Sequence, residues 1–84
     1  MPEISRFYGI VIKMYFPGNE HNPPHIHAVY QGYIVAISII DLDVIAGGMA
    51  PKALSMINEW IEIHREELLE MWNSHKIKKI EPLK

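Results

Sequence analysis

The 84-residue sequence predicts an α+β fold, an antiparallel β-meander of three to four strands followed by one long helix packed on one sheet face. Two observations predict it. Up to residue 46, short apolar segments with the two-residue alternation of strands are separated by turn residues. Residues 52–73, in contrast, hold no glycine or proline and repeat apolar residues at helical spacing. The length suits a single domain over residues 1–84, with a meander over 1–46, a helix over 51–73 and a basic tail over 74–84.

The first expected strand spans residues 7–16 and ends at the turn residues Pro17-Gly18-Asn19. Alternation predicts one face made of Tyr8, Ile10, Ile12, Met14 and Phe16, and an opposite face made of Phe7, Val11, Lys13 and Tyr15. A second strand is expected over residues 25–31. Its two faces are made of Ile26, Ala28 and Tyr30 on one side, and of His25, His27 and Val29 on the other.

Two further strands complete the expected meander. Gln31-Gly32 is a short turn into residues 33–40, an apolar run rich in β-branched residues that we expect to be buried on both sides. Asp41-Leu42-Asp43 makes the next turn. Residues 44–46 then form a short last strand, which Gly47-Gly48 ends.

The helix is expected to begin at Pro51, because proline is tolerated at the first helical position. Its apolar stripe, which must cover one face of the sheet, consists of Leu54, Ile57, Ile61, Leu68 and Met71 or Trp72. Trp60 and Trp72 fall slightly beside this stripe and are candidates for outward contacts. Beyond the helix, apolar residues predict that the tail docks loosely as an edge strand: Ile77, Ile80 and Leu83.

Composition excludes several classes of protein. There is no cysteine, which removes disulfide frameworks and thiolate sites, and no segment is long and uncharged enough to span a bilayer. No leader-like segment opens the chain, so we expect a cytoplasmic location and no membrane partner. The net charge is −2, although residues 74–84 hold four lysines against one glutamate. Nucleic acid is a weakly supported partner, because dedicated binders carry a broader basic face.

Three of the five histidines lie in the segment His21-Asn22-Pro23-Pro24-His25-Ile26-His27, which its two prolines stiffen. His25 and His27 leave the same face of a strand, and His21 can fold back across the turn to meet them. Three neutral imidazoles with an open position suit a divalent transition metal such as zinc, nickel or copper, and Glu20 can add a carboxylate. In this interpretation the segment is a metal site.

The same histidines also suit acid–base chemistry without a metal. His25 and His27 can remove a proton from a ribose hydroxyl and give one to the leaving oxygen, as in a small metal-independent ribonuclease. Lys13, Arg6 or a lysine of the tail then stabilises the phosphate charge. His64 falls on the apolar stripe. It is either a further member of the site or a buried imidazole bonded to a backbone carbonyl or a tyrosine. Whether the protein is an enzyme stays open.

A third interpretation is a binding module. One helix covers one sheet face, and the alternation leaves several apolar residues for the other: Phe7, Val11, Tyr15, Val29 and Tyr33. An exposed apolar patch of this kind predicts self-association as a homo-oligomer or a protein partner. The proline-histidine turn is then a rigid recognition loop.

Four segments carry a resemblance to a known family: residues 2–12, the His-Asn-Pro-Pro-His-Ile-His run, Glu59-Trp60 with residues 64–69, and residues 79–83. In this order they resemble the domain-of-unknown-function family 4160, over nearly the whole chain. The chain departs from the pattern at residues 47–51, where members usually have a glycine, a short spacer and Leu-Pro. The family's members are small prokaryotic proteins often encoded beside another short protein of unknown function. The resemblance therefore implies a partner-binding component of a two-gene, toxin–antitoxin-like module, and it implies no catalytic mechanism.

Overall fold

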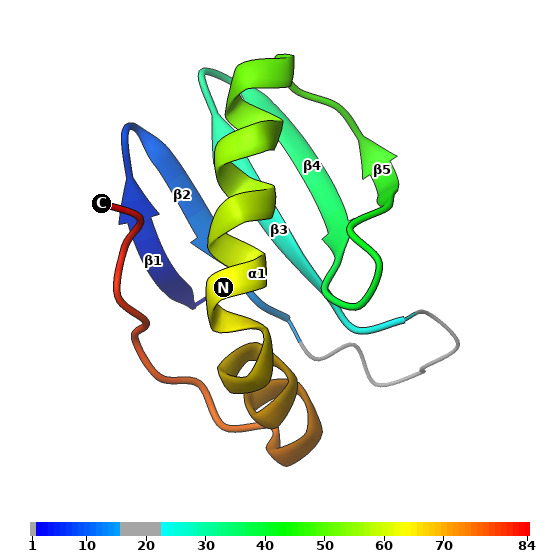
Figure 1. Ribbon diagram of the computed structural model, residues 1–84, viewed down its shortest axis with the longest axis vertical. Coiled ribbons are helices and arrows are strands. Elements are labelled where there is room, and N and C mark those ends of the chain that lie inside the picture. The colour runs from blue at the N-terminus through cyan, green and yellow to red at the C-terminus, as the bar shows by residue number, and fades with distance from the viewer. Residues whose placement is uncertain (1, 16–22) are drawn as a thin grey trace.

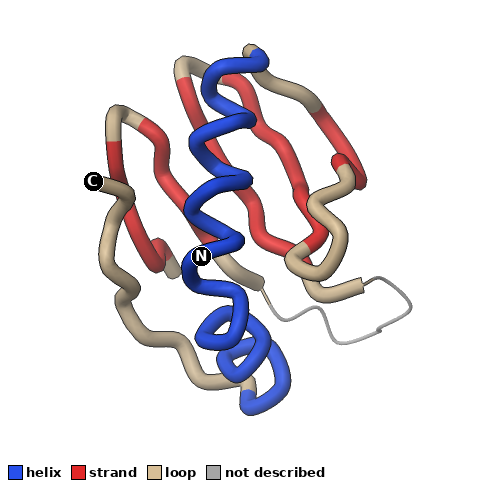
Figure 2. Tube along the Cα trace, viewed as in Figure 1, coloured by secondary structure: helices blue, strands red, loops and turns tan. Residues whose placement is uncertain are grey.

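The computed structural model describes residues 2–15 and 23–84. Within them, five strands precede one helix (Figure 1): β1 (Glu3–Phe7), β2 (Ile10–Lys13), β3 (His25–Tyr30), β4 (Tyr33–Ser38), β5 (Val44–Gly47) and α1 (Pro51–Ser74). The strands form one antiparallel sheet in chain order, and α1 lies across one of its faces (Figure 2). The expected α+β fold is confirmed, with five strands where three or four were expected.

The prediction of a single strand over residues 7–16 is wrong. β1 and β2 form a hairpin there, because Tyr8 and Gly9 have φ values of 51° and 82° and two consecutive residues with positive φ make a tight hairpin turn. Phe7 therefore pairs directly with Ile10, and both side chains point to the same face, which is buried. A continuous strand would have put them on opposite faces, so the predicted place of Phe7 on the other face is also wrong.

The turn between β3 and β4 is the one expected, with Gln31 and Gly32 at φ values of 49° and 83°. β4 is buried only in part. Tyr33 and Ile34 are 62% and 57% exposed, whereas residues 35–38 are buried. The expectation of burial on both sides therefore holds for the second half of this strand alone. β5 is the outer strand beside β4, and all four of its residues are exposed.

Helix α1 begins at Pro51, as expected, and is kinked at His64, where φ is −109° and ψ is 16°. His75 ends it in the left-handed conformation. The buried side chains are Ala53, Ile57, Trp60, Ile61, Leu68 and Met71. Trp60 follows Ile57 by three residues and shares its face, so the prediction of outward contacts for Trp60 is wrong. In the described part of the chain, no helix combines the length and apolar character needed to cross a membrane.

The core lies between α1 and the sheet face that the helix covers (Figure 2). Trp60 packs against Phe7 of β1, with ring centroids 5.7 Å apart. Ile26 and Ala28 of β3 are fully buried and pair with the buried residues Ile37 and Val35 of β4. Because side chains alternate along a strand, the residues between them, His27 above all, belong to the uncovered face.

The C-terminal tail runs beside β1 without forming a strand of its own (Figure 1). The N–H group of Ile80 donates a hydrogen bond of 2.8 Å to the carbonyl oxygen of Ile4, and the indole N–H of Trp60 donates one of 2.8 Å to the carbonyl oxygen of Glu81. Ile80 is only 5% exposed. The tail therefore covers the outer edge of β1.

Candidate functional site

Lys13 and His27 lie on the sheet face opposite α1, whereas His25, at the start of β3, reaches Trp72 of α1. β2 and β3 pair so that Lys13 lies directly opposite His27, which on its other side lies opposite Ala36 of β4. Directly opposed residues of antiparallel strands point to the same face. Lys13 and His27 are therefore neighbours, in the register that the acid–base interpretation needs.

Four aromatic rings form a row from the end of β2 to the last turns of α1. The ring centroids of Tyr15 and His27 are 4.6 Å apart, those of His27 and His25 are 5.1 Å apart, and those of His25 and Trp72 are 5.2 Å apart. Ring contacts of this kind each contribute on the order of 1 kcal/mol. The row joins three elements and orients both imidazoles without any ligand.

His25 is held in one tautomer by the proline turn. Its Nδ1 atom lies 2.9 Å from the carbonyl oxygen of Pro23, and a carbonyl oxygen can only accept a hydrogen bond. Nδ1 therefore carries the proton, and Nε2 is the unprotonated nitrogen of the neutral ring. The His25 side chain is also buried. Its Nε2 atom is thus a positioned base, hydrogen-bond acceptor or metal ligand.

His27 is less buried than His25 and has a different electrostatic environment. Burial lowers the pKa of His27 below its ordinary value of 6.5, and the neighbouring His25 lowers this pKa further. Across residues 2–15 and 23–84, no group forms a hydrogen bond with its buried Nδ1 atom. His27 is therefore predominantly neutral at pH 7.

The metal interpretation depends on residues beyond this geometry, because His21 and Glu20 lie outside the described residues. Among the residues that the structure does describe, no group of three or more histidine, aspartate or glutamate side chains is placed to hold a metal ion. His25 and His27 are two adjacent imidazoles, one ligand short of the predicted set. The participation of His21 stays a prediction.

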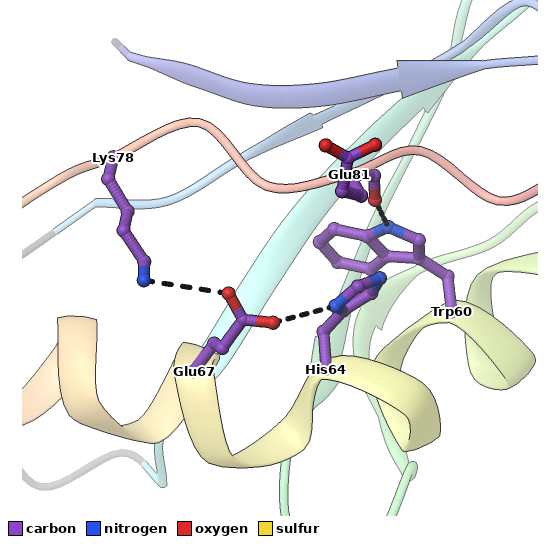
Figure 3. A network of polar contacts seen from close by, with 5 residues as sticks. All are labelled: Trp60, His64, Glu67, Lys78 and Glu81. Carbon is purple, nitrogen blue, oxygen red and sulfur yellow. Dashed lines mark hydrogen bonds and ion pairs between the residues drawn. The ribbon is translucent and has the colours of Figure 1, made fainter.

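His64 belongs to a separate cluster between α1 and the tail (Figure 3). Its Nδ1 atom donates a hydrogen bond of 2.9 Å to Glu67, and its ring packs on Trp60 with centroids 5.3 Å apart. The hydrogen bond from His64 is the main reason why the pKa of Glu67 lies below its ordinary value. Glu67 also pairs with Lys78 of the tail at 3.5 Å. His64 is thus a largely buried imidazole bonded to a carboxylate, where a backbone carbonyl or a tyrosine was expected.

A row of apolar side chains crosses the uncovered face beside Lys13 and His27. Val11 of β2 lies opposite Val29 of β3, which lies opposite Ile34 of β4. The valines are partly exposed and Ile34 is more than half exposed. Sequence reasoning missed Ile34, because the run from residue 33 to 40 looks like a strand buried on both sides.

Comparison with known proteins supports a family assignment. Residues 9–73 match the model of a family described as a domain of unknown function (DUF4160). The matched segment includes Lys13, His25 and His27 and leaves out β1 and the tail. No curated protein and no solved structure matches the chain.

Proposed function

The chain belongs to the DUF4160 family, and we propose that it is a partner-binding protein whose partner docks on the sheet face that α1 leaves uncovered. The observation that carries this proposal is the row of Val11, Val29 and Ile34 across three strands of that face. Apolar side chains that are aligned and exposed to water favour association. Beside the row, Lys13 and the neutral His27 add the polar groups that orient a partner.

The partner that we propose is the short protein encoded beside this one, in a two-gene, toxin–antitoxin-like module. An apolar centre with a polar border is the usual composition of a protein–protein interface. The buried ring of His25 packs beside His27 and holds it in place at the border of this surface. A polar group that is already held in place costs little entropy when the partner binds.

Binding of the two co-expressed and purified proteins, measured by titration calorimetry, tests this proposal. Val29→Glu puts a charge in the centre of the apolar row, and we expect it to weaken binding at least about tenfold. Ile63→Glu is the matched control, because Ile63 is a 61% exposed apolar residue of α1 outside the row, and it should leave the affinity unchanged. A wild-type pair that does not bind, or equal losses in both variants, would contradict the proposal.

A second candidate function is acid–base catalysis on RNA, which the hydrogen bond from His25 to Pro23 specifically favours. In this mechanism Nε2 of His25 takes the proton of a ribose hydroxyl, His27 protonates the leaving oxygen, and Lys13 stabilises the phosphate charge. Acid catalysis by His27 is the weaker part of this mechanism, because the lowered pKa of His27 leaves little of this side chain protonated at neutral pH.

RNA cleavage by the purified protein in the presence of a chelator tests the catalytic candidate. Cleavage that His25→Ala and His27→Ala each abolish would support it. Bound zinc, nickel or copper that the double variant loses would instead support the metal interpretation. If the double variant only lowers the melting temperature and leaves partner binding unchanged, the two histidines are structural.

A further inference from the structure

Exposed apolar side chains concentrate at one edge of the sheet. Of the seven large apolar residues that are exposed in the described part of the chain, five lie between residues 33 and 45: Tyr33, Ile34, Ile40, Val44 and Ile45. This region comprises β4, the loop that follows it, and the start of β5. Clustering of this kind on a small protein marks an interaction site.

The two outer strands of the sheet differ in their protection. The tail covers the outer edge of β1, whereas no other strand of the described residues pairs with the outer edge of β5 (Figure 1). Proteins protect such an edge with charged residues, with proline, with a very short strand or with a β-bulge. Residues 44–50 contain no charge and no proline. β5 therefore presents an uncharged edge with apolar side chains, shielded only by its length of four residues and its irregular register.

The pairing of β4 with β5 leaves one residue of β5 without an opposite residue on β4. Val44 lies opposite Ile37 and Ala46 lies opposite Ala36, so the ladder shifts between them and Ile45 has no partner on β4. The additional residue of a β-bulge is left unpaired. Ile45 is also 40% exposed and stands at the middle of Val44-Ile45-Ala46.

We propose that two copies of this chain pair β5 with β5 in antiparallel orientation, around a two-fold axis at Ile45, so that both sheets become one. In this arrangement Val44 lies opposite Ala46 of the second copy, and the two Ile45 side chains meet. The interface differs from the proposed partner surface, since it uses the edge of the sheet and not its face. It also closes at two copies, because the other edge of each sheet is covered by the tail.

Charge distribution favours the antiparallel arrangement. The acidic residues nearest to β5 are Asp41 and Asp43, both exposed and both before its first residue. A two-fold axis at Ile45 places the aspartates of the two copies at opposite ends of the pairing. Parallel pairing would bring them together, and like charges directly opposite each other are destabilising.

Sedimentation equilibrium of the full chain and four variant samples tests this inference. The wild type should sediment as a dimer at micromolar concentration. Ile45→Lys alone and Ile45→Glu alone should each sediment as a monomer, because the axis places two like charges face to face, and their equimolar mixture should recover the dimer. Ile63→Lys is the control, an exposed residue of α1 that should leave the dimer intact.

The equimolar mixture shows whether a monomeric variant has lost the interface or has lost its fold, because two misfolded variants would not form a dimer with each other. A monomeric wild type, an Ile45→Lys variant that stays dimeric, or a mixture that stays monomeric would each overturn the inference. Partner binding by Ile45→Lys reports separately on the proposed function. We expect that binding to be unchanged, because Ile45 lies outside the row of Val11, Val29 and Ile34.

Discussion

Two histidines that stand two residues apart on β3 have different surroundings. His25 donates its Nδ1 proton to the carbonyl oxygen of Pro23 and packs against Trp72, whereas the buried Nδ1 of His27 has no such partner among the described residues. The contrast decides what each ring can do. The ring of His25 is fixed in orientation by Pro23 and Trp72, and His27 is a ring whose charged form is disfavoured by burial.

Titration of the imidazoles by NMR tests this contrast. We expect His27 to titrate below 6.5, because burial and the neighbouring His25 both disfavour its charged form. His25→Gln removes the second cause and should raise the pKa of His27 part of the way towards 6.5, whereas His64→Gln should not change it. Because the fold disfavours the charged form of His27, the contribution of His27 to the free energy of unfolding is fully present above pH 6.5. This contribution should decrease as the pH falls through the pKa of His27. A pKa of His27 at or above 6.5 would refute the assignment.

Gly47 is a residue whose backbone permits no side chain. Its φ is +74°, and a Cβ atom there would overlap the carbonyl oxygen of Ile34. Gly47→Ala should therefore lower the free energy of unfolding by about 2 kcal/mol in a urea titration. Gly48→Ala is the matched control, because a Cβ atom at Gly48 meets nothing within 4 Å and its φ is not positive. Equal stability of the two variants would contradict this account.

At the scale of the elements, periodicity predicted α1, β3, β4 and β5 well, because each has a continuous pattern bounded by turn residues. It failed at Tyr8-Gly9, although the same combination of a residue and a glycine at Gln31-Gly32 was correctly interpreted as a turn. The apolar residues on both sides of Gly9 concealed the turn. β1 was missed for this reason, and with it the buried position of Phe7.

The tail is the element whose contribution to stability the contacts define most clearly. Ile80 is 5% exposed and hydrogen-bonds to β1 through its backbone, so Ile80→Ala should lower the free energy of unfolding by about 2–3 kcal/mol. Ile63→Ala, which removes the same atoms from a 61% exposed position, should change it by less than about 0.5 kcal/mol. Chemical denaturation of both variants measures the difference. If the tail does not stay docked in solution, the two variants should have equal free energies of unfolding.

At the scale of the whole molecule, the candidate site could be predicted only where it is local. The spacing of His25 and His27 and the prolines before them indicated a site from sequence alone, and strand alternation allowed Lys13 to join them. The contact between His25 and Trp72 could not be predicted, because it joins β3 to the last turns of α1 through the arrangement of the helix on the sheet. Long-range packing decides such contacts, and periodicity does not encode it.

The whole molecule has two surfaces of different kind: a sheet face with an apolar row beside His27, and the open edge of β5. The central claim is that the face binds a protein partner. Methyl NMR spectra of the protein, recorded with and without the proposed partner, are the sharpest test of this binding. We expect the methyl signals of Val11, Val29 and Ile34 to shift on binding, whereas that of Ile63 should not. Shifts confined to Ile63 and the outer side of α1, or no shifts at all, would show that the partner does not bind this face.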